Sequence, residues 1–230
     1  MCHEVGVIQR TVKKITRVLV DLIYPPSCPL CNSLFSQHDR PCDDCQASLL
    51  KIEGEAYLHH LPRVWIDRCI SCYAYEGSLR EAIHGFKYQE RFDLLNFLAR
   101  GLSHTAAAYG HFDAICPVPM HPRRLKSRGY NPAALLAARV GQNLNATVCL
   151  NLLRCIRYTP CQMELTQKER LANVKGAFAV ADNGSTKVEG KTLLVIDDVL
   201  TTGATANECA RVLKKNGASH VAVLTVARTL

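Results

Sequence analysis

The sequence predicts an α/β protein in which helices flank a parallel sheet, with a small N-terminal zinc ribbon. Strand-like apolar runs alternate with helical patterns in the C-terminal part of the chain, as in proteins built from strand–helix–strand units. Two C-x-x-C knuckles lie close together near the N-terminus, and paired knuckles are typical of a zinc site. We therefore expect an N-terminal helix and zinc ribbon at residues 1–60 and a larger domain at residues 66–230.

The composition is that of a globular protein, and its charge is unevenly distributed. Of the 230 residues, 48% are hydrophobic and 21% are charged, which argues against a disordered or fibrous chain. The net charge is +8, yet residues 1–65 hold seven Lys and Arg against seven Asp and Glu. The excess positive charge therefore belongs to the larger C-terminal part, where we expect an anionic ligand to bind.

The N-terminal residues lack the pattern of a membrane span or a secretory signal. The apolar run at residues 18–23 is interrupted by Asp21, and a transmembrane helix needs roughly 20 apolar residues. No small-residue cleavage site follows it, as a signal peptide would require. We expect a cytoplasmic protein whose residues 8–23 form an amphipathic helix ended by Pro25 and Pro26. Such a helix packs on its own protein or lies on a membrane surface.

Four cysteines have the spacing of a zinc ribbon. The stretch "CPLCNSLFSQHDRPCDDC" places two C-x-x-C pairs ten residues apart, and they contain Cys28, Cys31, Cys42 and Cys45. Four thiolates close a tetrahedral site, so the expected Zn²⁺ is structural rather than catalytic. Because residues 24–60 contain few apolar side chains, metal binding would supply much of the folding free energy of this segment.

A third pair, Cys69 and Cys72, has the same spacing but no fourth knuckle to complete a second site. Its surroundings, "RCISCYAYEG", alternate and are rich in strand-forming residues, so we interpret this segment as a strand. His59 and His60 are metal ligands in principle, but four cysteines already close the first site.

The stretch "VIDDVLTTGATAN" at residues 195–207 joins a predicted strand to a predicted helix. Residues 192–196 form a continuous apolar run, as in a strand buried on both faces. Residues 205–215 have helical spacing, and residues 220–226 form the next buried strand. This order places Asp197 and Asp198 at the carboxyl end of a parallel strand, the edge at which open α/β sheets bind ligands.

The loop after these acids has the character of a phosphate site. Backbone N–H groups at a helix start bind anions, hydroxyl groups add donors, and glycine permits a close approach. The loop residues are Thr201, Thr202, Gly203, Ala204 and Thr205. The two carboxylates repel phosphate but suit a vicinal diol or a water-bound Mg²⁺, so the pattern describes a phosphoribosyl ligand. The alternative is an ordinary turn with Asp198 exposed and the threonines as caps.

A cluster of basic residues follows another predicted strand. Pro117 and Pro119 end a strand that begins at Ala114, and Asn131 caps a helix that has Pro132 at its first position. Between them lie four cations that suit pyrophosphate oxygens, namely Arg123, Arg124, Lys126 and Arg128. The alternative is a solvated basic face.

The strand–loop–helix stretch resembles the phosphoribosyl pyrophosphate motif of type I phosphoribosyltransferases: apolar residues, two acids, two further residues and T-T-G-x-T. In that family the acids hold the ribose hydroxyls and the loop holds the 5′-phosphate. The resemblance implies these roles for Asp197, Asp198 and the loop at 201–205, and a type I phosphoribosyltransferase-like sheet. Purine-salvage members have an acid where this chain has Thr201, which makes purine salvage a less favoured activity.

Further stretches resemble the ComF family of competence-associated proteins, which carry an N-terminal zinc ribbon. They are "YPPSCPLC", "AYEGSLREAIHGFKY", "CPVPMHPRRLKSRGYNPAALLA" and "CQMELTQKERLANVKGAF". The resemblance implies a pyrophosphate loop after the strand at Ala114. It also implies a link to DNA uptake or to nucleotide metabolism, with single-stranded DNA and the uptake helicase machinery as partners in the first case.

Two functions are therefore expected. In the first, the protein is a phosphoribosyltransferase that binds phosphoribosyl pyrophosphate with Mg²⁺; Asp197, Asp198 and Arg128 act in catalysis, and a loop within residues 158–170 excludes water. In the second, it is a non-catalytic protein that handles single-stranded DNA with its basic cleft and zinc ribbon. One basic cleft would serve both ligands, and the sequence does not name an acceptor.

Overall fold

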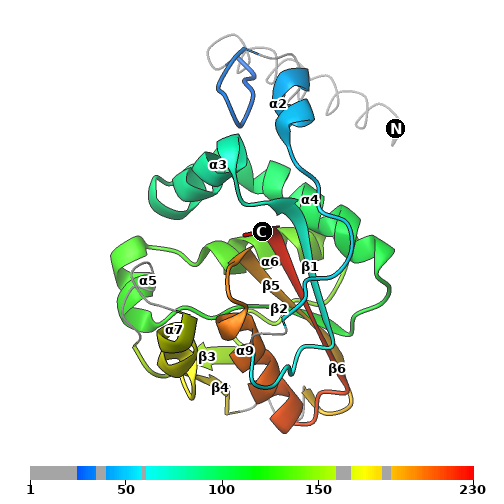
Figure 1. Ribbon diagram of the computed structural model, residues 1–230, viewed down its shortest axis with the longest axis vertical. Coiled ribbons are helices and arrows are strands. Elements are labelled where there is room, and N and C mark those ends of the chain that lie inside the picture. Colours follow the sequence, from blue (N-terminus) through cyan, green and yellow to red (C-terminus); the bar gives the residue numbers. More distant parts are fainter. Residues whose placement is uncertain (1–24, 35–39, 59–60, 159–166, 183–187) are drawn as a thin grey trace, which may run out of the picture.

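Four parallel strands form the central sheet of the computed structural model, which describes residues 25–34, 40–58, 61–158, 167–182 and 188–230 (Figure 1). Their order across the sheet is β1-β6-β5-β2, and every neighbouring pair is parallel. The strands are β1 (Arg68–Ala74), β2 (Ala114–Pro117), β5 (Thr192–Leu200) and β6 (His220–Arg228). The predicted parallel sheet is confirmed.

Helices cover both faces of this sheet. One face packs against three helices: α3 (Gly77–Tyr88), α4 (Leu95–Ala108) and α6 (Pro132–Leu144). The opposite face packs against α9 (Ala204–Lys215). Beside α9 lie α7 (Gln167–Val174) and a small antiparallel sheet of β3 (Leu153–Cys155) and β4 (Phe178–Val180), which the sequence did not predict. Three short helices complete the described elements: α2 (Asp43–Ser48), η1 (Phe92–Leu94) and α5 (Pro122–Arg128).

The apolar run of β5 is continuous because both of its faces are covered. Leu193 and Val195 belong to the core cluster under α9, whereas Leu194 and Ile196 belong to the cluster under α3, α4 and α6. All four side chains are buried. Side chains alternate along a strand, so each core cluster receives every second residue of β5.

The strand β5 is longer than the sequence predicted. It extends to Leu200 rather than ending at Ile196, because its backbone stays paired with β6 as far as Arg228. Backbone pairing does not require apolar side chains. The pairing of β5 with β2 ends earlier, where Ile196 lies opposite Pro117.

Strands β2 and β5 meet at a topological switch point. The chain leaves β2 toward α6 on one face of the sheet, and it leaves β5 directly into α9 on the other face. Loops that diverge between neighbouring parallel strands leave a crevice at their carboxyl ends. The predicted helix start is also confirmed, since the Asn131 side chain accepts a hydrogen bond from the Ala133 N–H and Pro132 is the first helical residue.

Residues 50–56 connect the N-terminal part to the sheet. Their backbone pairs with β1 in antiparallel fashion: Ile52 N–H donates to Cys72 O at 3.1 Å, and Ala56 N–H donates to Cys69 O at 2.7 Å. Cys69 and Cys72 are buried within β1, which confirms the strand interpretation of this pair.

Some expectations fall on residues outside the described parts. These are the amphipathic helix at 8–23, the pair His59 and His60, and most of the loop expected at 158–170. Residues 167–170 of that loop are described, and they form the first turn of α7 rather than a loop. Among the described helices, none has both the length and the apolar character needed to cross a bilayer.

Candidate functional site

The two acids of β5 point to opposite faces of the sheet. Asp197 follows the alternation of Val195, and Asp198 follows that of Ile196. Asp197 is half-buried and Asp198 is buried, with 8% of its surface exposed. The alternative of an ordinary turn with an exposed Asp198 is therefore wrong in this respect, because α3 covers the side of the strand on which Asp198 lies.

A lysine from α3 pairs with Asp198. The Lys87 Nζ atom lies 2.7 Å from Asp198 Oδ1, and the two side chains are 19% and 12% exposed. Burial opposes the charged form of Lys87, but the carboxylates of Asp198 and Asp197 outweigh this effect and raise the pKa of the ammonium group. Lys87 is therefore a fixed positive charge beside the two acids.

Asp197 ionises close to neutral pH. Burial, followed by the neighbouring Asp198 carboxylate, raises the pKa of Asp197 from 3.8 to about 7. Lys87 acts in the opposite direction, and so does the Asp198 N–H, which donates to Asp197 Oδ1 at 2.9 Å. A cationic ligand at this place would stabilise the carboxylate form, and a hydroxyl group would find a strong acceptor there.

The loop at 201–205 opens α9 at the mouth of the crevice. Gly203 is the N-cap residue of α9, and its φ of +69° is a conformation that favours glycine. A Cβ added at Gly203 would lie 2.8 Å from Leu58 Cδ2, so the end of the buried Leu58 side chain would have to shift to admit a larger residue. The first N–H groups of α9 have no intrahelical partner, and all five loop residues line the same pocket as the acids.

The predicted cluster of four cations is divided by the geometry of α5. Arg124 and Arg128 lie one helical turn apart, and both line the pocket. Arg123 and Lys126 are exposed and lie outside the pocket lining. These two residues therefore belong to a solvated basic face, which was the alternative interpretation of the cluster. The reason is that a helix presents only one side to the crevice.

The pocket has a volume of about 440 Å³ and a wall formed by α3. Helix α3 was not among the elements that we predicted for the site from the sequence. Its pocket-lining residues share one face of the helix, and they are Arg80, His84, Lys87 and Tyr88. The buried face carries Leu79, Ala82, Ile83 and Phe86. A polar stripe opposite this apolar stripe was the signal available in the sequence.

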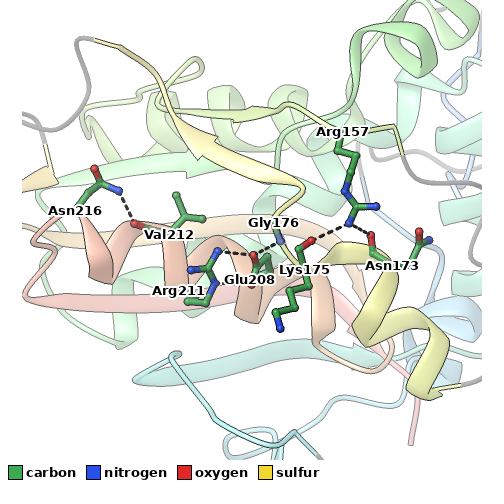
Figure 2. Close-up of polar contacts among 8 residues, drawn as sticks. All are labelled: Arg157, Asn173, Lys175, Gly176, Glu208, Arg211, Val212 and Asn216. Carbon is green, nitrogen blue, oxygen red and sulfur yellow. Dashed lines mark hydrogen bonds and ion pairs between the residues drawn. The ribbon is translucent and has the colours of Figure 1, made fainter.

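Polar contacts outside the pocket lining join the segments on either side of α7 and the helix α9 (Figure 2). Glu208 of α9 accepts a hydrogen bond from the Gly176 N–H at 2.7 Å. Arg157 Nη2 donates to the carbonyl oxygens of Asn173 and Lys175 at 2.7 and 2.8 Å, where α7 ends. The Glu208 bond connects the segment before β4 to α9, and the Arg157 bonds connect the segment after β3 to the end of α7.

The four cysteines of the two knuckles come together in one cluster. Their sulfur atoms all lie within 4.8 Å of one another, and the Sγ atoms of Cys31 and Cys42 are 3.7 Å apart. Four Zn–S bonds of about 2.3 Å in a tetrahedron require sulfurs about 3.8 Å apart. The Cys42 N–H donates to Cys28 Sγ at 3.3 Å, which suits a thiolate. The donor set fits a structural zinc ion, and within the described residues it is the one group of this kind.

Arg91 joins the ribbon to the larger domain. Its Nη2 atom lies 3.2 Å from both Pro29 O and Asn32 Oδ1, in the first knuckle, and 2.7 Å from Asp93 Oδ2. Arg91 follows α3 directly, and Figure 1 places α2 and the first knuckle next to α3. The ribbon is thus anchored at the end of the helix that supplies Lys87.

Comparison with known proteins identifies both parts of the chain. Residues 93–229 match the phosphoribosyl transferase domain, and residues 19–56 match the double zinc ribbon domain. The chain is 31% identical to competence protein F of Haemophilus influenzae over 209 residues, which cover 88% of this chain and 85% of that protein. It is 29% identical to DNA utilization protein YhgH of Escherichia coli, with coverages of 88% and 84%.

Solved structures also resemble the larger domain. A purine phosphoribosyltransferase from Pyrococcus horikoshii aligns with a TM-score of 0.36 and 17% identity, over 59% of this chain and 83% of that one.

Proposed function

Because the chain belongs to the competence protein F family and carries a phosphoribosyl transferase domain, we propose that it binds phosphoribosyl pyrophosphate together with Mg²⁺. The observation that carries this proposal is the gathering of several groups in one pocket at the switch point. The pocket contains two carboxylates, a helix-opening loop and two arginines from three separate elements. These groups match the diol, the 5-phosphate and the pyrophosphate of the ligand, respectively.

The 5-phosphate binds at the loop of residues 201–205. The N–H groups in the first turn of α9, which have no intrahelical acceptor, and the positive end of the helix dipole attract an anion. The hydroxyl groups of Thr201, Thr202 and Thr205 add donors around the same place. Gly203 keeps the backbone close to the ligand, since its conformation excludes most side chains.

The ribose diol binds to the two acids. Asp197 and Asp198 offer carboxylate oxygens, which accept hydrogen bonds from hydroxyl groups. Their oxygens are also the ligand type that Mg²⁺ prefers, directly or through water, and the ion would neutralise charge on the pyrophosphate. Ionised Asp197 becomes the dominant form when a cation or a hydroxyl donor approaches, because both stabilise the carboxylate.

The pyrophosphate faces Arg124 and Arg128 of α5, whose planar guanidinium groups suit phosphate oxygens. In transfer, the bond between C1 of ribose and the pyrophosphate oxygen breaks, and its electron pair leaves with the pyrophosphate. A lone pair of the acceptor forms the new bond to C1, and a proton carried by the acceptor atom passes to solvent. The arginines lower the barrier by holding the charge that develops on the leaving group.

Thermal unfolding with and without the ligand tests this proposal. Phosphoribosyl pyrophosphate with Mg²⁺ should raise the melting temperature of the wild-type protein by mass action. The double variant Asp197→Asn/Asp198→Asn should stay folded and lose the shift. Asp182→Asn is the control, because Asp182 is 88% exposed and lies outside the pocket. An equal shift in the double variant would show that the ribose is held elsewhere.

A second candidate function is the handling of single-stranded DNA. The pocket mouth combines Tyr88, which is 52% exposed, with Arg128, whose Cζ lies 4.5 Å from the centre of the Tyr88 ring. Aromatic faces beside cations stack bases and attract the phosphate backbone. Two relatives are named competence protein F and DNA utilization protein YhgH, and these names support a role in handling DNA.

Salt-dependent DNA binding distinguishes the cleft from the ribbon. If DNA follows the cleft, the variant Arg124→Ala/Arg128→Ala, which removes the two pocket-lining arginines of α5, should weaken binding and flatten its salt slope by about 0.7 for each lost phosphate contact. Phosphoribosyl pyrophosphate should then compete with DNA. Arg40→Ala/Lys51→Ala removes two cations from the ribbon side and should have little effect. The opposite pattern would assign DNA to the ribbon.

A further inference from the structure

Two cations of the pocket, Arg80 and Lys87, come from a part of the chain that neither family match covers. The phosphoribosyl transferase match begins at residue 93 and the zinc ribbon match ends at residue 56. Helix α3 (Gly77–Tyr88) lies between them, and Lys87 is in its last turn. This residue nevertheless contacts Asp198 at 2.7 Å, inside the proposed ribose site.

The core fixes the rotation of α3 and with it the direction of Lys87. Ile83 and Phe86 are fully buried in the cluster that also contains Ile196 of β5. The side of α3 that carries Phe86 faces the core. Because Lys87 is the next residue along the helix, it lies on the edge of α3 that borders the pocket. Lys87 is therefore delivered to the strand exit by the packing of the helix rather than by a flexible loop.

The contact leaves one oxygen of Asp198 for a ligand. The Lys87 ammonium lies against Oδ1, so Oδ2 is the oxygen available to a sugar hydroxyl. A carboxylate without a fixed partner rotates about its terminal bond, and ordering it costs binding free energy. A cation that is fixed in advance removes part of this cost, because the acceptor is oriented before the ligand arrives.

We propose that Lys87 is a positioning residue of the ribose site, which holds Asp198 in the orientation that accepts a ribose hydroxyl. This inference rests on the proposed function, because it assumes that the acids bind the diol. A purely structural role would be different: Lys87 would neutralise a buried acid and have no effect on how the site distinguishes a sugar from a bare phosphate.

Titration calorimetry with two probes separates these roles. Orthophosphate tests the loop at 201–205 alone, and ribose 5-phosphate tests the loop together with the acids. The quantity of interest is the ratio of the two affinities. A hydroxyl bonded to a charged acceptor is worth about tenfold or more in affinity, so the wild-type protein should prefer ribose 5-phosphate by at least about tenfold.

Three substitutions at Lys87 give the test. Lys87→Met should reduce the preference for ribose 5-phosphate about tenfold, while the affinity for orthophosphate stays within about twofold of the wild-type value. Lys87→Arg keeps the cation and should recover part of the preference. If Lys87→Met does not fold, Lys87→Ala replaces it, because the short side chain leaves room for water and makes no hydrogen bond to Asp198.

The outcomes are distinguishable. A Lys87→Met or Lys87→Ala protein with the wild-type preference overturns the inference and leaves the proposed function intact. Equal losses for both probes also overturn it, because Lys87 would then act as a general attraction for phosphate. A wild-type protein that shows no preference for ribose 5-phosphate contradicts the proposed function itself, and the inference fails with it.

Discussion

Replacing Asp197 by asparagine should stabilise the ligand-free protein at alkaline pH. The environment raises the pKa of this carboxyl group from 3.8 to about 7, so the folded state binds a proton more tightly than the unfolded state does. A raised pKa of this size makes ionisation in the folded protein about 4 kcal/mol more costly. Asparagine has no charge to bury, and its side-chain oxygen retains the acceptor for the Asp198 N–H.

The sign and the pH window follow from the two pKa values. Below pH 3.8 Asp197 is protonated in both states, so the substitution has little effect. As the pH rises toward about 7, the unfolded state loses its proton while the folded state keeps it, and the wild-type protein loses stability. Because the side chain is half-buried, water reduces the cost, and we expect Asp197→Asn to be more stable by about 2 kcal/mol near pH 8.

Urea denaturation followed by circular dichroism measures this difference. The free energy of unfolding of both proteins is compared at several values between about pH 4 and pH 8, without ligand, and similar m-values show that the unfolded states are comparable. The difference should be near zero at the acidic end and should grow as the pH rises.

The neighbouring acid provides the matched control. Asp198→Asn removes the partner of Lys87, whose side chain is 19% exposed, and an unpaired buried ammonium group should cost about 2 kcal/mol. The same Asp→Asn change is thus expected to raise the free energy of unfolding at position 197 and to lower it at position 198. An Asp197→Asn protein that is less stable than the wild type near pH 8, or a difference that does not vary with pH, would refute the reasoning.

Three further predictions concern the ribbon and the loop. Purified protein should contain one equivalent of zinc by metal analysis, and Cys42→Ser should lose the metal and loosen its segment; two equivalents, or none, would contradict this. Gly203→Ala should cost about 2–3 kcal/mol in urea denaturation, against about 1 kcal/mol for Gly176→Ala, since both have positive φ but only Gly203 has Leu58 within 3 Å; equal losses would exclude the contact. Arg91→Ala should speed zinc release to a chromophoric chelator severalfold, because it removes two bonds to the first knuckle; an unchanged rate would show that this anchor does not protect the metal.

Local features of the chemistry could be predicted from the sequence because their parts are close together along the chain. The four cysteines lie within eighteen residues and meet in one cluster. The acids and the loop at 201–205 lie within nine residues and line one pocket. Sequence patterns over such short stretches predict strands, turns and helices, so the order of strand, loop and helix around Asp197 could be predicted from the sequence. The parallel sheet follows from the same order.

Features that depend on distant segments were decided by the tertiary structure. Arg124 and Arg128 face the pocket whereas Arg123 does not, because the packing of α5 selects one side of the helix. Lys87 is 111 positions from Asp198 in the sequence yet lies 2.7 Å from it. That contact forms only because α3 packs its apolar side against the sheet. It raises the pKa of Lys87, and Lys87 in turn limits the rise in the pKa of Asp197; neither effect can be predicted from the local sequence around these residues. The sequence alone thus determined which groups form the motif, whereas the fold determined which charges surround it, because charge interactions depend on distance in space and on burial.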